Sequence, residues 1–212
     1  MSEPLRYLSN ADVSTALPTP LRAVELAGQA LRMRAHGAAQ VPPKPAVTFG
    51  DNAFANAMPV AAPGLLGCKW ITLVPANASQ GLPTANGLMI VSDAETGLPV
   101  CLMAAGALPL DYASSIGARL ASTCTVWSDD VEQFAAVAPA KLGADYPLAT
   151  DWVGRRLPEP NVGSRTLAEG RPMGRLLCQN LGNAASDIVV AAEVAATATA
   201  RGLGQVLEGE LR

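Results

Sequence analysis

The stretch GCKWITLVPANASQGLPTANGLMIVSDAETGLPVCLM, residues Gly67–Met103, decides the fold of this chain. Short apolar runs alternate in it with Gly, Pro, Asn and Asp, a pattern typical of β-strands joined by turns. With the residues just upstream, the pattern predicts five strands, at Ala46–Phe49, Phe54–Val60, Cys68–Val74, Gly87–Ser92 and Pro99–Met103. Their hairpin-like spacing predicts a largely antiparallel sheet.

One charged residue, Lys69, interrupts the apolar run Cys68–Val74. Side chains alternate across a strand, so Lys69 is expected to share a face with Ile71 and Leu73. An ammonium among apolar side chains is costly unless it faces a pocket or water. Lys69 is therefore the first candidate for a functional residue.

Helical patterns flank the predicted sheet. Thr19–Gly37 carries an apolar stripe at helical spacing, made of Leu21, Val24, Gly28, Leu31 and Ala35. The charged residues between them, Arg22, Glu25, Arg32 and Arg34, are expected on a solvated face. Further helices are predicted at Leu108–Ser122 and at Ser186–Gly202, the latter with Ser186 or Asn183 as its N-cap.

These elements predict an α+β fold with a largely antiparallel or mixed sheet and helices on one face. The other face of the sheet is rich in Val, Ile and Leu. An exposed apolar surface of that size usually marks an interface, so we expect a homodimer that buries sheet against sheet.

Composition narrows the class of protein. The chain has 212 residues, 50% of them hydrophobic, and a formal net charge of −3. This length suits one domain, or one domain with an appendage. Lys and Arg are scattered, which argues against a nucleic-acid partner. The apolar run Ile188–Ala200 is shorter than a membrane span, and MSEPLRYL does not resemble a signal peptide. We expect a cytoplasmic protein with no membrane partner.

Four cysteines without CxxC spacing and a single histidine, His36, give little support for a metal site. The histidine count also argues against a Ser-His-Asp or Cys-His hydrolase. The chemistry therefore has to come from lysines, carboxylates, tyrosines and amides.

Several motifs carry a family resemblance. They are GLP, NG, DAETG and LM in register within Gly67–Met103, PPKP at Pro42–Pro45, NAMP at Asn56–Pro59, RYLSNADV near the start and ARGLGQ near the end. The chain resembles the ornithine cyclodeaminase/μ-crystallin family. That resemblance implies enzymes that convert amino or imino acids, with a substrate-binding, dimerising sheet domain and a Rossmann domain for a nicotinamide cofactor.

In the family, the Rossmann domain is inserted after the helix that corresponds to Leu108–Ser122. Here only about forty residues, Ala121–Asn161, stand in its place, and the sequence has no GxGxxG. Within them, VWSDDVEQF at Val126–Phe134 looks like the family's last Rossmann strand. The resemblance thus implies one substrate domain, residues 1–122 and 162–212, with residues 123–161 as a remnant linker. No cofactor is expected, and hydride transfer is excluded.

The resemblance carries over to individual residues only in part. Lys69 matches a lysine that contacts the substrate. Lys44 stands where the family usually has an arginine for the substrate carboxylate, and Asn56 stands where the cyclodeaminases have a catalytic glutamate. Tyr112 stands where a second carboxylate-binding arginine is usual. Lys for Arg keeps the charge but loses the bidentate fork.

Two hypotheses follow. In the first, the protein is a cofactor-independent cyclase, lyase or isomerase of specialised metabolism, acting by proton transfer on an amino-acid, imine or carbonyl compound. Lys69, as a base or an imine former, Tyr112 and Asp111 are then catalytic. The expected substrate-binding residues are Lys44, Asn56, Met58 and Thr84. In the second, the chain is a non-catalytic ligand-binding or assembly protein derived from the same family.

Overall fold

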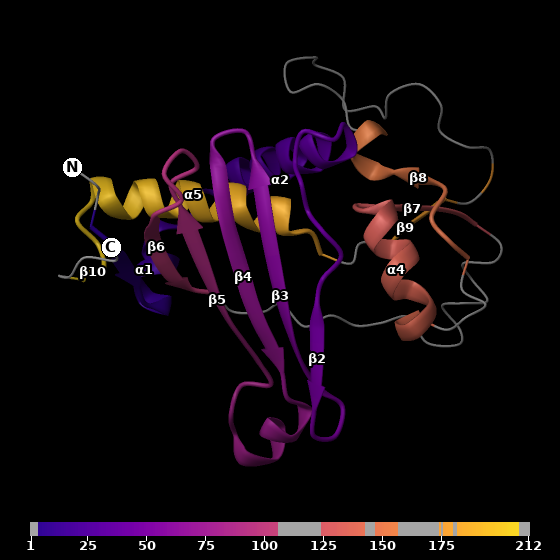
Figure 1. Cartoon of the computed structure of the whole chain (residues 1–212), viewed down its shortest axis with the longest axis horizontal. Coiled ribbons are helices and arrows are strands. Elements are labelled where there is room, and N and C mark those ends of the chain that lie inside the picture. Colours follow the sequence, from indigo (N-terminus) through magenta and orange to yellow (C-terminus); the bar gives the residue numbers. More distant parts are fainter. Residues whose placement is uncertain are drawn as a thin grey trace.

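A seven-stranded sheet forms the main body of the protein, in the order β10-β1-β6-β5-β4-β3-β2 (Figure 1). The computed structural model describes residues 4–105, 124–142, 147–156, 174, 176–179 and 182–207. The strands are β1 Arg6–Leu8, β2 Ala46–Phe49, β3 Ala53–Ala62, β4 Leu65–Leu73, β5 Ala85–Ser92, β6 Pro99–Ala104 and β10 Gln205–Val206.

The five strands predicted between Ala46 and Met103 are confirmed as β2–β6, each antiparallel to the next. The sheet is mixed because β1 runs parallel to β6. Strand β10 pairs antiparallel with β1 at the far edge and has no counterpart among the predicted strands. The α+β class with a mostly antiparallel sheet is thus confirmed.

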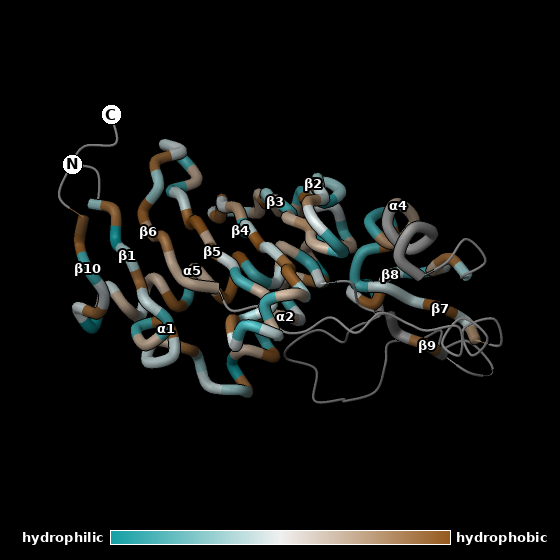
Figure 2. Tube along the Cα trace, turned by 90° about the horizontal axis from the view of Figure 1, so that it is seen from below, coloured by the Kyte–Doolittle hydropathy of each residue, from teal (hydrophilic) through white to brown (hydrophobic). Residues whose placement is uncertain are grey.

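Three helices lie on one side of this sheet, as Figure 2 shows: α1 Asn10–Ala16, α2 Pro20–Ala35 and α5 Ala184–Ala200. Helix α5 contacts β3, β4 and β5 directly, and α2 packs against α5. The predicted N-cap Asn183 is confirmed, because its side chain accepts a hydrogen bond from the backbone N–H of Ala185. The predicted helix Leu108–Ser122 lies outside the described residues.

The apolar stripe predicted for α2 is wrong in its first half. Leu21 and Val24 are 72% and 69% exposed. The side chains that α2 buries are Leu26, Ala30, Arg34 and Ala35. Arg34, which we expected on a solvated face, is instead enclosed by carboxylates from another part of the chain. An ion pair formed over so long a sequence separation leaves no trace in the periodicity of the helix.

A second, smaller unit lies beside the main sheet. It consists of β7 Thr125–Ser128, α4 Val131–Leu142, β8 Asp151–Trp152, η2 Val153–Arg156 and β9 Leu176–Gln179. We call it the small lobe. Its three strands are parallel, in the order β8-β7-β9. The predicted strand at Val126 is therefore present, and η2 connects the lobe to the body by packing on α2.

The core between sheet and helices depends on a close approach at Gly67 in β4. A Cβ at this position would lie 2.4 Å from the carbonyl oxygen of Ile90 and 2.6 Å from Cδ1 of Ile188. Glycine therefore lets Ile188, in the first half of α5, reach the backbone of the sheet. The contact also brings Asp187, the residue before it, next to β4.

We predict that Gly67→Ala lowers the free energy of unfolding by about 1–3 kcal/mol, because the added methyl group overpacks the contact between β4 and α5. Gly28→Ala is the matched control. It lies inside α2, its nearest neighbour would be Nη1 of Arg32 at 3.5 Å, and alanine should add up to about 1 kcal/mol of helix stability. Urea unfolding followed by circular dichroism measures both. Equal effects of the two changes would contradict the close-approach argument.

Candidate functional site

Lys69 lies on the face of the sheet that α5 covers. In the register of the strands it stands opposite Met58 of β3 and Met89 of β5, which are both buried. Its side chain is only 16% exposed. The alternation expected from the sequence therefore does direct this ammonium inward, into mainly apolar surroundings.

The charge of Lys69 is met by Asp187, whose carboxylate lies 3.0 Å from the Lys69 ammonium. Asp187 belongs to the first turn of α5, where a carboxylate also interacts favourably with the helix dipole. Sequence reasoning did not single out Asp187. The only local signal was an acidic residue soon after an N-cap, which is ordinary in helices.

Lys44 approaches the same end of α5 from the segment before β2. Its ammonium nitrogen lies 3.9 Å from the position that a Cβ on Gly182 would take. Gly182 has a φ of +78° and precedes the N-cap Asn183. Lys69 of β4 and Lys44, which precedes β2, thus both lie near the N-terminal end of α5.

Asn56 adds a buried amide to this face of the sheet. It is 7% exposed, and its Oδ1 atom has no hydrogen-bond partner among the described residues. It stands opposite Ile71, two residues along β3 from Met58, and so on the same face as Met58. A buried, unpaired amide oxygen costs about 1–3 kcal/mol, so this position favours a ligand that donates a hydrogen bond.

The remaining candidates do not join this group. Thr84 precedes β5 and its carbonyl oxygen accepts a hydrogen bond from the backbone N–H of Val74. It lies five residues before Met89, the partner of Lys69, and so about 16 Å away along the strand. Tyr112 and Asp111 lie outside the described residues. The structure therefore places Asn56, Met58 and Lys69 on one face of the sheet and Lys44 near Gly182, and leaves Thr84 apart.

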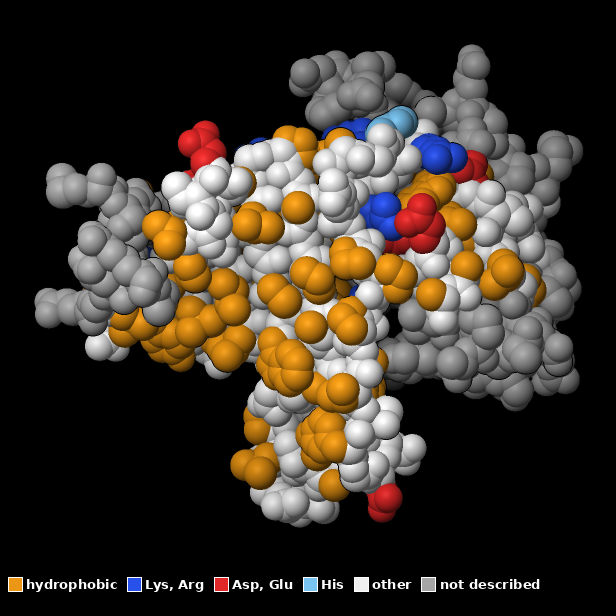
Figure 3. Space-filling model, in the orientation of Figure 1, with side chains coloured by type: hydrophobic (Ala, Val, Ile, Leu, Met, Phe, Trp, Pro, Cys, Tyr) orange, Lys and Arg blue, Asp and Glu red, His pale blue; other side chains and the backbone are white. Residues whose placement is uncertain are grey.

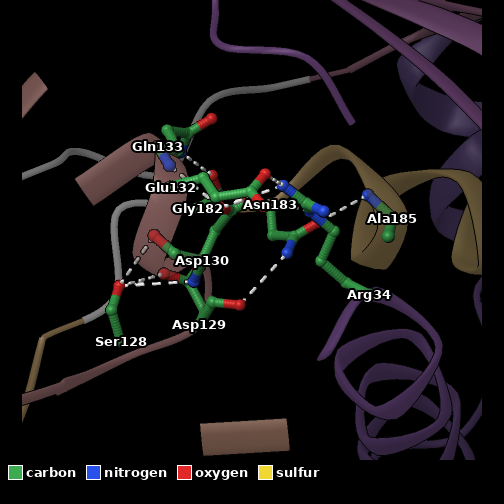
Figure 4. A network of polar contacts seen from close by, with 9 residues as sticks. All are labelled: Arg34, Ser128, Asp129, Asp130, Glu132, Gln133, Gly182, Asn183 and Ala185. Atoms are coloured by element: carbon green, nitrogen blue, oxygen red, sulfur yellow. Dashed lines mark hydrogen bonds and ion pairs between the residues drawn. The ribbon is translucent and has the colours of Figure 1, made fainter. Parts of the chain in front are cut away.

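A second polar cluster lies where β7 ends, in the sequence Ser128–Gln133 (Figure 4). Arg34 of α2 binds both oxygens of the buried Asp130, at 2.8 and 3.2 Å, and a carboxylate oxygen of Glu132 at 2.6 Å. Burial on its own lowers the pKa of Arg34, but the hydrogen bonds that Arg34 donates to Asp130 and Glu132 outweigh it and raise the pKa. The Arg34 guanidinium also lies over the Trp152 ring, 5.0 Å from the centroid.

The turn after β7 is acidic and already capped. The glycine-rich turn that binds a pyrophosphate follows the first strand of a nucleotide-binding domain, whereas β7 lies in the segment that resembles the last such strand. Here Asp129 and Asp130 follow the strand, both are buried, and Asp130 Oδ1 accepts the backbone N–H of Gln133. Asp130 is also paired with Arg34, so this turn binds groups of the protein itself.

The opposite face of the sheet presents large apolar side chains. Trp70 stands directly opposite Leu88, and Cys68 opposite Ile90. We call these four residues, with Leu102, the outer face. Trp70 is 45% exposed, and Figure 3 shows hydrophobic side chains spread over the strands on this side. A cavity of about 470 Å³ opens here, lined in part by Trp70, Leu88 and Asn10.

Two classes of site find no support in the described residues. Within those ranges, His, Cys, Asp and Glu side chains form no group suited to a metal ion. Within the same ranges, none of the helices combines the length and apolar character that crossing a membrane requires.

Comparisons with known proteins agree with the sequence resemblance. The model of the ornithine cyclodeaminase/mu-crystallin family matches residues 7–117. Nodulation efficiency protein NfeD of Rhizobium meliloti is 35% identical over 127 residues, 59% of this chain and 38% of that protein. Alanine dehydrogenase of Archaeoglobus fulgidus is 41% identical over 75 residues, 35% of this chain and 23% of that protein. The chain thus matches well under half the length of either relative.

Solved structures show the same fold at low sequence identity. CmnK superimposes with a TM-score of 0.75 at 18% identity, over 98% of this chain and 99% of that one. An archaeal alanine dehydrogenase dimer with bound NAD superimposes with a TM-score of 0.72 at 16% identity, over 97% and 99% of the two chains. At this level of identity the likeness supports the fold alone.

We predict that Asn56→Leu raises the free energy of unfolding by about 1 kcal/mol or leaves it unchanged, because it removes a buried oxygen that lacks a partner. The comparison variant is Asn183→Leu, which removes an amide whose oxygen and nitrogen are both hydrogen-bonded and should destabilise by about 1 kcal/mol or more. Thermal unfolding measures both. A clear loss of stability in Asn56→Leu would show that the Asn56 amide is bonded within the fold.

Proposed function

Because this chain belongs to the ornithine cyclodeaminase/mu-crystallin family, we propose that it is an enzyme acting on a small amino-acid, imine or carbonyl compound. In this proposal the substrate binds between the α5 side of the sheet and the N-terminal end of α5. Catalysis proceeds by proton transfer, as in a cyclase, lyase or isomerase. The observation that carries the proposal is the partly buried ion pair of Lys69 and Asp187.

The ion pair favours one role for Lys69. The Lys69 side chain donates a hydrogen bond to the Asp187 carboxylate at 3.0 Å, and the same amino group can donate to a substrate atom. We therefore assign Lys69 as the acid that protonates or polarises a carbonyl or imine of the substrate, rather than as an imine-forming amine. Asp187 fixes the direction of the ammonium and takes no part in bond making.

Three neighbours support binding. Lys44 offers a point charge for an anionic group of the substrate, without the bidentate geometry of an arginine. The unpaired oxygen of Asn56 accepts a hydrogen bond from the substrate. Met58, opposite Lys69, gives an adaptable apolar wall. Tyr112 and Asp111 remain proposed as further proton-transfer groups, and Thr84 stays a sequence-based candidate.

We propose that the reaction needs no nicotinamide cofactor. Support comes from the lack of GxGxxG in the sequence. In this reading, residues 1–122 and 162–212 form the substrate domain and residues 123–161 replace a nucleotide-binding domain. Strand β9 pairs with β7, so the returning segment shares a sheet with that remnant.

We also propose that the protein is a homodimer joined through the outer face. Trp70, Leu88 and Ile90 are partly exposed apolar side chains on adjacent strands. Surfaces of this kind seldom stay uncovered in water. A two-fold contact through this face would not cover Lys69, because Lys69 points to the other side of the sheet.

We expect Lys69→Met to lower turnover by at least about 100-fold, because it removes the proton donor. The assay is mass spectrometry on a panel of amino acids, imines and 2-oxo acids without added nucleotide. The matched control is Arg22→Met, which also removes a cation paired with α5, through Glu193, but at the surface. Full turnover in Lys69→Met contradicts the proposal. Binding without turnover in the wild-type protein favours the alternative, a non-catalytic ligand-binding or assembly protein.

For the dimer, we predict that Trp70→Lys produces monomers, because a charge replaces the centre of the apolar face. Leu148→Lys is the control, since Leu148 is also exposed but belongs to the segment before β8. Light scattering after size exclusion measures the mass of each variant. A wild-type monomer, or a dimer that survives Trp70→Lys, would contradict this interface.

A further inference from the structure

The small lobe contacts the body of the protein through a continuous chain of hydrogen bonds that ends at Lys69. We propose that Gln133 and Asn183 are positioning residues, which set the orientation of the Lys69 ammonium by holding the first turn of α5. The inference rests on the proposed function only in taking Lys69 as the reactive side chain. Figure 4 shows the residues that form the chain of contacts between Arg34 and Ala185.

The chain begins at the ion pair of Arg34 and Asp130. Both side chains are almost fully buried, and Arg34 contacts the two carboxylate oxygens at once. Asp130 Oδ1 also accepts the backbone N–H of Gln133 at 2.9 Å. Helix α2 of the body thereby fixes the start of α4 in the small lobe.

The next link leads from the lobe to the segment before α5. The side-chain amide of Gln133 donates to the carbonyl oxygen of Gly182 at 3.1 Å. One residue further on, Asn183 donates from Nδ2 to the carbonyl oxygen of Asp129 at 3.4 Å. Two neighbouring residues ahead of α5 are thus held by two residues of the β7–α4 turn.

The last link runs inside α5. The side-chain oxygen of Asn183 accepts the N–H of Ala185 at 2.8 Å, and its backbone carbonyl accepts the N–H of Asp187 at 3.3 Å. Asp187 then contacts Lys69. Any displacement of Asn183 therefore moves the residue that holds the ammonium.

The burial of Gln133 indicates that it is kept for this role. It is 2% exposed, yet its Oε1 atom has no partner among the described residues, and Figure 4 shows that oxygen directed away from Gly182. An apolar side chain of the same size would avoid the cost of an unpaired oxygen. It would also lose the single hydrogen bond that Gln133 donates to Gly182.

The test measures how fast Lys69 reacts with an amine-specific acylating reagent, using peptide mass spectrometry on the whole folded protein. In Gln133→Met, which keeps the size of the side chain and removes the donor, we expect labelling of Lys69 to be about threefold faster, as loss of one hydrogen bond would allow. Ala198→Gly is the control. It destabilises α5 near its C-terminal end, outside the chain of contacts, and should leave the rate unchanged.

Asn183→Asp gives an independent second variant. It keeps an oxygen to cap Ala185 but removes the donor to Asp129, and we again expect faster labelling of Lys69. If Gln133→Met does not fold, the labelling rate of Lys69 in Asn183→Asp tests the proposal. Unchanged labelling, or an equal increase in Ala198→Gly, overturns the proposal. The labelling rate of Lys69 can be measured whether or not the protein turns over a substrate. A protein without turnover would therefore contradict the proposed function and leave the positioning role of Gln133 and Asn183 testable.

Discussion

The ion pair between Lys69 and Asp187 is the constraint on which the arrangement of the protein depends. An ammonium on the covered face of a sheet is tolerated only if a carboxylate meets it there. Asp187 can do so because Gly67, two residues before Lys69, lets Ile188 rest on the strand backbone. The position of α5, the packing of the core and the candidate site therefore follow from a single contact between β4 and the first turn of the helix.

The small lobe is connected to the pair of Lys69 and Asp187 through the N-terminal end of α5. It contains three parallel strands and a buried acidic turn. The carboxylates after β7 are directed at Arg34, and the amides of Gln133 and Asn183 connect that turn to α5. The turn after β7 thus carries polar and charged groups that bind the protein's own elements.

Local sequence signals predicted the five central strands well, because Gly50, Gly64 and Gly97 mark turns with positive φ angles between apolar runs. They also identified Lys69, since a charge inside such a run is conspicuous. They failed where the deciding partner is distant. Asp187 is 118 positions from Lys69, and Arg34 was assigned to a solvated face because its partner Asp130 lies in another lobe. For α2, residue periodicity predicted a stripe that begins with Leu21 and Val24, whereas the helix buries Leu26 and Ala30.

Strand alternation explains how one strand can serve two purposes. In β4, Lys69 points toward α5 and Trp70 points toward the outer face, so the candidate site and the apolar surface are separated by the thickness of one sheet. A shift of one residue in the pairing with β3 and β5 would exchange them. It would place the tryptophan under the helix and the ammonium on the outer face. The contact of Gly67 with Ile188 and the pair of Lys69 and Asp187 both require the observed register, so the features that build the site also prevent that shift.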